Sequence, residues 1–202
     1  MARALARRRA DIEFELNGEQ LTPPSALRVE VAQYHAWRRS EEVQAAGLRP
    51  LRTELTVAYR IDGLVVSAGQ IDALFVDGNG LHYLVDFKRS RKPLDPDTPT
   101  FGRTGSGPVG HVPDTAFHRY SLQASLYAVM LLQTHHLLCN GGLYLLRMHT
   151  DAASYEMVQC EDLTTEAVAM LQAENERLLA TPAGTAATHE AVPVAADVSF
   201  AR

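Results

Sequence analysis

An α/β fold is predicted for this chain of 202 residues by three observations. Two apolar stretches, 64–77 and 81–88, flank the turn sequence Asp77-Gly78-Asn79-Gly80, which is typical of an antiparallel hairpin. Helical patterns are expected in three segments: 25–46, 117–137 and 165–179. The composition, 46% hydrophobic and 21% charged, is that of an ordinary globular protein with a sizeable core.

The N-terminal helix is expected to begin at Ser25, a residue type that favours the N-cap position, and to run to about Ala46. Gly47 follows as its stop. An apolar stripe on one face of this helix is formed by Leu27, Val31, Tyr34 and Trp37. Residues 51–60 then predict a strand that carries Glu54, and the hairpin follows that strand.

Residues 89–116 interrupt every regular pattern with five prolines and four glycines. A loop of this length inside a compact domain is uncommon unless it is functional or disordered, and a loop that contacts or gates the substrate is the preferred interpretation. Strands are expected over 143–148 and 155–160. The helix over 165–179 has three capping candidates before or at its start: Asp162, Thr164 and Thr165.

Three regions are expected along the chain. Residues 1–24 predict a basic tail and a small hairpin, residues 25–180 a single domain, and residues 181–202 a poorly ordered tail rich in Ala, Thr, Val and Pro. The Arg-rich N-terminus is not followed by the apolar segment of a secretory signal. The sequence also lacks an apolar run near the roughly 18 residues of a membrane span, so no membrane partner is expected.

The two cysteines, Cys139 and Cys160, are too few for a disulfide framework, a zinc finger or a four-cysteine iron–sulfur cluster. An intracellular, reducing compartment is therefore expected, and cytoplasm, nucleus and mitochondrion remain open. The formal net charge of -5 means that binding of nucleic acid would need a local basic surface.

Charged residues interrupt the two apolar strands of the hairpin. Asp72 lies in the first strand, and Asp86 and Lys88 lie in the second. Unpaired charges in buried strands are costly, and two neighbouring carboxylates repel each other unless a cation lies between them. Asp86 and Lys88 are two residues apart and so share one strand face. Two acidic ligands beside an ammonium group suit a hard divalent cation and a phosphate.

At these positions the chain resembles the PD-(D/E)XK nuclease superfamily, most closely its RecB-like and lambda-exonuclease-like branch. The matching segments occur in the order of the family: Arg52-Thr53-Glu54-Leu55, Ala68-Gly69-Gln70-Ile71-Asp72, Val85-Asp86-Phe87-Lys88 and Tyr120-Ser121-Leu122-Gln123-Ala124-Ser125-Leu126-Tyr127. The last contains the Gln-x-x-x-Tyr element of that branch. The resemblance implies the restriction-endonuclease-like αβββαβ core, a central mixed sheet flanked by helices.

The resemblance also implies a role for each matching residue. Asp72 and Asp86 would bind Mg²⁺ or Mn²⁺, together with Glu54 and the backbone carbonyl of Phe87. His35 is a further possible ligand, although the Gly-Thr that usually precedes such a histidine is missing, and a surface or core histidine is an equal alternative.

Lys88 would orient the attacking water and stabilise charge on the phosphate, a contribution of about 10²–10³ in rate for one preorganised donor. Gln123 and Tyr127 would share a helix face, with Gln123 catalytic and Tyr127 in contact with the substrate. Further substrate contacts are expected from the basic residues that follow the lysine strand: Arg89, Arg91, Lys92, Arg103 and Arg119.

The function predicted on this basis is a divalent-metal-dependent deoxyribonuclease in DNA repair, recombination or replication. The Gln-x-x-x-Tyr element favours exonuclease over endonuclease activity, on single- or double-stranded DNA. Two alternatives stay open: a catalytically silent nucleic-acid-binding module on the same fold, and a nuclease that acts on RNA.

Overall fold

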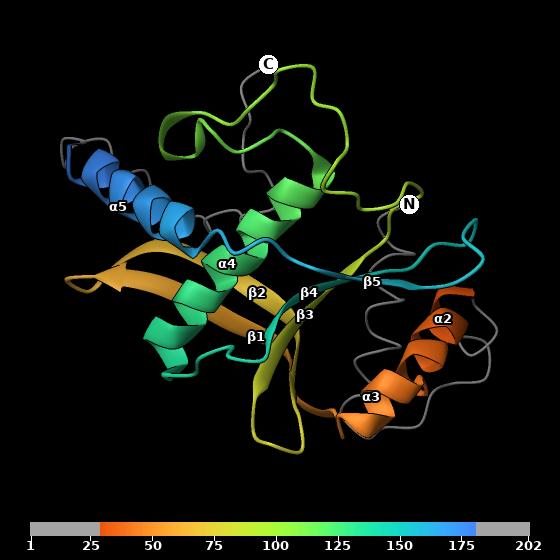
Figure 1. Ribbon diagram of the computed structural model, residues 1–202. Coiled ribbons are helices and arrows are strands. Elements are labelled where there is room, and N and C mark those ends of the chain that lie inside the picture. Colours follow the sequence, from red (N-terminus) through yellow and green to blue (C-terminus); the bar gives the residue numbers. More distant parts are fainter. Residues whose placement is uncertain (1–28, 181–202) are drawn as a thin grey trace. The chain divides into compact units, whose positions relative to one another are not determined.

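The computed structural model describes residues 29–180, which form a five-stranded sheet and its helices (Figure 1). The strands lie in the order β1-β2-β3-β4-β5, with β2–β3 and β4–β5 antiparallel and β3–β4 parallel. In chain order the elements are α2 (Val29–Arg38), α3 (Glu41–Ala45), β1 (Arg49–Ile61), β2 (Leu64–Val76), β3 (His82–Lys88), the 3₁₀ helix η1 (Gly107–Val109), α4 (Ala116–His135), β4 (Gly142–Arg147), β5 (Glu156–Gln159) and α5 (Thr164–Ala180).

The predicted α/β class is confirmed, and so is the order helix, three strands, helix, strand with a mixed sheet. The single helix predicted over 25–46 is wrong, because two helices lie there. Ser40 has an extended backbone and its hydroxyl accepts a hydrogen bond from the N–H of Val43, so it caps a second helix. The predicted stop is confirmed, since Gly47 follows α3 in the left-handed region with φ 60°.

Of the three capping candidates of α5, Asp162 precedes the helix and the two threonines lie inside it. The carboxylate of Asp162 accepts a hydrogen bond from the N–H of Thr164 at 3.0 Å, whereas Thr164 and Thr165 lie within α5 itself. Hydrogen bonds from Thr164 lower the pKa of Asp162. The expected Ser25 cap, the small hairpin within 1–24 and the tail 181–202 lie outside the described residues. The single-domain interpretation of 25–180 stays a prediction.

The predicted hairpin is confirmed as the antiparallel pair β2–β3, with Ala73 opposite Val85. Its turn is closed by Asp77, whose Oδ1 accepts hydrogen bonds from the N–H groups of Asn79 and Leu81, both at 2.8 Å. The hydroxyl of Tyr83 donates to Oδ2 of the same carboxylate at 3.1 Å. One aspartate therefore fixes the turn that sets the register of the two strands.

The described residues divide into two compact units. The first comprises 29–55, Ile71–Leu94 and Cys139–Gln159. In this unit α2 and α3 pack against one face of the sheet. Trp37 lies edge-on to Phe75 at 5.4 Å between ring centroids, and Tyr34 lies edge-on to Phe87 at 6.0 Å. This core holds β3 against the two N-terminal helices.

The second unit comprises Thr56–Gln70, Asp95–Leu138 and 160–180. Here α4 and α5 pack together, and two serines of α4 accept hydrogen bonds from the backbone that leads into α5. The end of α4 also binds the edge strand, because Thr134 and Gln133 pair with the backbone N–H and C=O of Ala58 and Arg60. Side chains of α4 thereby occupy edge groups that could otherwise pair with another chain.

The second half of the long segment between β3 and α4 packs against the protein and does not extend into solvent. Val109 of η1 and Val112 are buried, and Thr104 pairs with Pro113 as an isolated bridge. The expected role of this loop in substrate contact stays a prediction.

The Asp77 carboxylate predicts a pH-dependent contribution to stability. Burial favours its neutral form, but the hydrogen bonds from Leu81, Asn79 and Tyr83 outweigh burial and hold its pKa below the ordinary value. A lowered folded-state pKa stabilises the protein above the unfolded pKa of about 3.9, and this contribution is lost as the pH falls through the folded-state pKa. We expect Asp77→Ala to lower Tm at pH 7 and to flatten the fall in Tm below pH 4, as measured by circular dichroism. If Tm of Asp77→Ala fell below pH 4 as steeply as Tm of the wild type, the stabilising role of the Asp77 carboxylate would be contradicted.

Candidate active site

The strongest site candidate is built where β2 and β3 meet. Oδ2 of Asp72 accepts a hydrogen bond from the N–H of Phe87 at 2.9 Å, so the carboxylate reaches directly onto β3. Nζ of Lys88 lies 2.7 Å from Oδ2 of Asp86. The two aspartates are only 3% and 4% exposed. Asp86 and Lys88 lie on one face of β3, as expected from their spacing, and Asp72 reaches the same strand through the N–H of Phe87.

Oδ2 of Asp86 is buried and accepts no hydrogen bond of ordinary geometry, so its contact with Lys88 is mainly an attraction between charges. A buried carboxylate oxygen that lacks a hydrogen-bond donor is expensive unless a charge lies close to it. Two carboxylates at adjacent strand positions also fit the coordination of Mg²⁺ or Mn²⁺, which use one or two protein carboxylates and several waters. Asp72 and Asp86 therefore suit a divalent cation.

The structure does not gather the expected side-chain ligands Asp72, Asp86, Glu54 and His35 into one metal-binding group. Within residues 29–180, the acidic, histidine and cysteine side chains form no group of three that could hold a metal ion. Glu54 lies in β1 with a left-handed backbone, φ 47°, which is unusual for a residue within a strand. His35 lies half-buried on α2 with its ring 5.9 Å from that of Tyr34. The roles predicted for Glu54, His35 and the Phe87 carbonyl stay predictions.

The Gln-x-x-x-Tyr element lies on α4, in the second unit. Nε2 of Gln123 donates a hydrogen bond to the hydroxyl of Tyr127 at 3.0 Å, as expected for side chains four residues apart on α4. Tyr127 is 2% exposed, and its ring fills the space beside Gly69 on β2. The predicted roles of Gln123 in catalysis and Tyr127 in substrate binding stay predictions.

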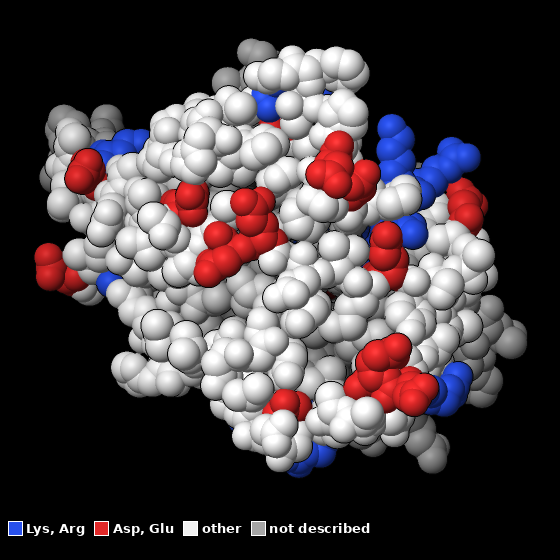
Figure 2. Space-filling model, in the orientation of Figure 1, with Lys and Arg blue, Asp and Glu red and all other residues white. Residues whose placement is uncertain are grey.

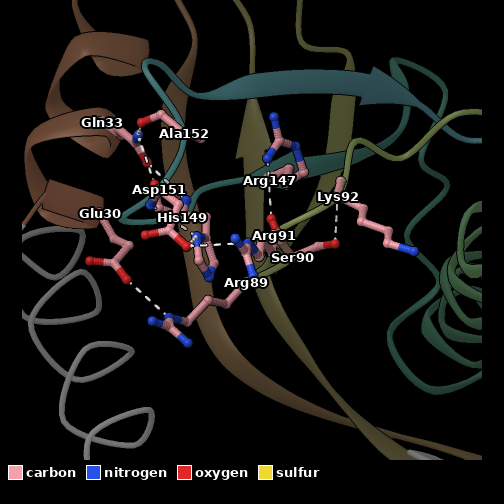
Figure 3. A network of polar contacts seen from close by, with 10 residues as sticks. All are labelled: Glu30, Gln33, Arg89, Ser90, Arg91, Lys92, Arg147, His149, Asp151 and Ala152. Carbon is pink, nitrogen blue, oxygen red and sulfur yellow. Dashed lines mark hydrogen bonds and ion pairs between the residues drawn. The ribbon is translucent and has the colours of Figure 1, made fainter.

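The basic residues after β3 differ in how they are held (Figure 3). Nε of Arg89 donates to the buried carboxylate of Glu30 on α2 at 3.0 Å, which ties this arginine to the N-terminal helix. Arg91 and Asp151 form an exposed ion pair at 3.4 Å. Lys92 is exposed. Such exposed groups keep their charge available to a polyanion.

In the second unit, Arg119 forms an ion pair with Asp114 at 2.7 Å, while Arg103 is exposed and its Nε donates to the carbonyl of Thr100 at 3.4 Å. On the face drawn in Figure 2, acidic groups are spread over several places, and the basic groups of the described residues gather in small clusters rather than in one continuous surface.

Sequence analysis did not single out Arg147, the last residue of β4. Its Nε donates to Oε2 of Glu156 at 2.5 Å and its Nη1 to the carbonyl of Ser90 at 3.1 Å. The only local signal was a charged residue at the end of an apolar strand, which is commonplace. What sets Arg147 apart is its pairing with Lys88 in the parallel ladder, and that pairing depends on the fold.

No protein-family model matches the chain, and no curated protein matches it. The solved structures that resemble it include a candidate exonuclease from Eubacterium rectale, at 13% identity and a TM-score of 0.48, over 86% of this chain. The chain spans 65% of the length of that protein. Another is SSO0001, at 17% identity and a TM-score of 0.38, over 87% of this chain and 72% of the other. Both likenesses concern the fold alone.

In the described part of the chain, no helix is both long enough and apolar enough to cross a membrane.

The contact between Gly69 and Tyr127 predicts a strong effect of a single methyl group. A Cβ at position 69 would lie 2.4 Å from the Tyr127 ring, so Gly69→Ala should destabilise the fold by about 1–3 kcal/mol through overpacking. Gly78→Ala is the matched control, because a Cβ there meets only ordinary contacts at 3.6 Å. Urea unfolding of both variants measures the difference. Equal stabilities would contradict the packing of this element.

Proposed function

We propose that this protein is a divalent-metal-dependent nuclease that hydrolyses phosphodiester bonds in DNA. The observation that carries the proposal is the arrangement of three charged groups on β2 and β3: buried Asp72 accepts a hydrogen bond from the N–H of Phe87 on β3, and Lys88 lies against buried Asp86 on the same strand. The order of the sequence motifs supports the same function. Activity from DNA ends and a place in DNA repair, recombination or replication are parts of the proposal that rest on the resemblance alone.

Each residue has a distinct task in this chemistry. Asp72 and Asp86 would hold the metal, which when bound lowers the pKa of water and offsets phosphate charge. Asp72 is itself fixed by the N–H of Phe87, so its carboxylate cannot swing away from β3 without losing that bond. Lys88, held beside Asp86, would donate to a phosphate oxygen and orient the attacking water.

A purely structural ion pair explains the site less well. Burying a charged pair is seldom a net gain in stability relative to apolar residues of similar volume. Asp72 and Asp86 place two carboxylates at almost fully buried positions on neighbouring strands. A cation bound between them would offset the repulsion of the two negative charges, as expected at a metal-dependent site.

The second candidate function is a catalytically silent nucleic-acid-binding module. Two observations favour it: Glu54 joins no metal-binding group among the described residues, and Gln123 is bonded to Tyr127. Such a module would retain DNA in a salt-sensitive way but would not cleave it in any metal.

Lys88 provides the direct test of catalysis. We expect purified protein to cleave end-labelled DNA with Mg²⁺ or Mn²⁺ but not with EDTA, and Lys88→Ala to lower the rate by about 10²–10³. Because this change also leaves Asp86 without its cation, Lys88→Arg is included: it keeps the charge and stability but should lose most activity, since a planar guanidinium cannot replace a compact ammonium.

The same assay, run on linear and circular DNA and on RNA, distinguishes the alternatives. Cleavage of linear but not circular DNA would establish an exonuclease, and cleavage of RNA alone would change the substrate class. Absence of cleavage in every metal, with DNA still bound, would replace the nuclease by the silent module. Full activity of Lys88→Ala would remove Lys88 from the mechanism.

Asp72 provides a test of metal binding that needs no turnover. Asp72→Asn keeps an oxygen that can accept the Phe87 N–H but loses the charge, so we expect the fold to persist and Mn²⁺ affinity to fall about tenfold or more. Titration calorimetry measures the affinity. Asp62→Asn is the control, because Asp62 is an exposed turn residue with φ 50°, a conformation that asparagine tolerates. Equal Mn²⁺ affinity of Asp72→Asn and wild type would exclude Asp72 as a ligand.

A further inference from the structure

The face of the sheet that carries the candidate site continues onto two more strands. Side chains on adjacent strands that are directly paired point to the same side of a sheet, and alternate residues of one strand do so too. Asp86 and Lys88 of β3 pair with Leu145 and Arg147 of β4, and Arg147 pairs with Glu156 of β5. These residues therefore share one face.

The opposite face confirms this alternation. Val85 of β3 and Leu146 and Met148 around β4 all belong to the core that packs against α2 and α3. Arg89, the residue after Lys88, also turns to that side and binds Glu30 of α2 (Figure 3). Arg147 instead lies on the side of Lys88, in the neighbouring position about 4.8 Å away along the sheet.

The guanidinium of Arg147 is only partly used by the protein. Its Nε is bonded to Glu156 and one N–H of Nη1 to the carbonyl of Ser90, two residues after Lys88. Of its five donors, the other three make no hydrogen bond to the described residues. The side chain is 10% exposed, so water competes little with any anion that reaches those donors.

We propose that Arg147 is a phosphate-binding residue of the site, acting beside Lys88 on the substrate backbone. This inference rests on the proposed function and adds a residue that the sequence motifs do not contain. A planar guanidinium already oriented by two hydrogen bonds presents its remaining N–H groups in a fixed direction, which suits two oxygens of one phosphate. Lys88 and Arg147 then form a pair of cations across neighbouring strands.

Glu156 has a defined part in this arrangement. Its carboxylate orients Arg147 and partly neutralises it while no substrate is bound, because opposite charges at this distance attract strongly. A phosphate that reaches Arg147 must therefore share the guanidinium with Glu156. Removing the charge of Glu156, while keeping an oxygen that accepts from Nε, should strengthen the attraction between Arg147 and phosphate.

The test compares Arg147→Gln with Glu156→Gln in DNA binding with EDTA present, over a range of salt concentrations. We expect Arg147→Gln to weaken binding about tenfold and to reduce the slope of log affinity against log salt by about one. Glu156→Gln should tighten binding about threefold. The matched controls are Arg177→Gln and Glu174→Gln, an arginine–glutamate pair on α5 that should leave the slope unchanged.

The opposite signs expected for the two substitutions exclude a merely structural role. If Arg147 only fixed the backbone at Ser90, both substitutions would weaken binding and lower Tm together, and the proposal would fail. Should Arg147→Gln not fold, tighter binding by Glu156→Gln still supports the proposal and unchanged or weaker binding overturns it.

The failure of this inference is distinguishable from failure of the proposed function. Wild-type protein that cleaves DNA with metal, alongside Arg147→Gln with an unchanged salt slope, would overturn the role of Arg147 alone. Wild-type protein that neither binds nor cleaves DNA or RNA would overturn the nuclease and with it the phosphate site.

Discussion

The pairing of β3 on both sides is the constraint on which the rest of the site depends. β3 is antiparallel to β2 and parallel to β4, so one strand sets the positions of Asp72, Lys88 and Arg147 together. A slip of one residue in either ladder would turn a whole set of side chains to the other face of the sheet. The turn closed by Asp77 fixes the register between β2 and β3. The core fixes the register between β3 and β4.

Stability and chemistry are separated by the two faces of the same strand. Val85 and Phe87 point toward α2 and α3, where Phe87 meets Tyr34, while Asp86 and Lys88 point to the other side. The energy gained by burying the apolar face holds the strand in place, so the charged face can be costly without unfolding the protein. Phe87 links the apolar face of β3 to the charged face. Its side chain packs against the core, and its N–H orients the carboxylate of Asp72.

Local patterns explain how much could be predicted from sequence. The β2–β3 hairpin and the Asp86–Lys88 pair depend on residues that are close along the chain, and both are present in the structure. The break in the N-terminal helix was missed because Ser40 reads equally well as a polar residue on a helix surface, whereas in the structure it caps α3. The left-handed backbone of Glu54 has no sequence signal, because its neighbours Thr53 and Leu55 read as ordinary strand residues.

Arg147 was missed for a different reason. Its relation to Lys88 exists only through the parallel pairing of β3 with β4, which are joined through the long loop and α4. Parallel strands need such a crossover, and no local pattern gives the register at its end. Residues that become neighbours through such a pairing can be identified only once the register of β3 and β4 is known, because neither side chain stands out in the sequence.

The charges along this face suggest why metal and phosphate binding would depend on each other. Asp72, Asp86 and Glu156 carry three negative charges and Lys88 and Arg147 two positive ones, so the row has a formal charge of -1. The excess negative charge opposes the attraction of Lys88 and Arg147 for a polyanion, in a chain whose net charge is already -5. A divalent cation held by the two aspartates would change the sign of the row to +1. By linkage, phosphate would then bind more tightly with metal present, and metal more tightly with phosphate present.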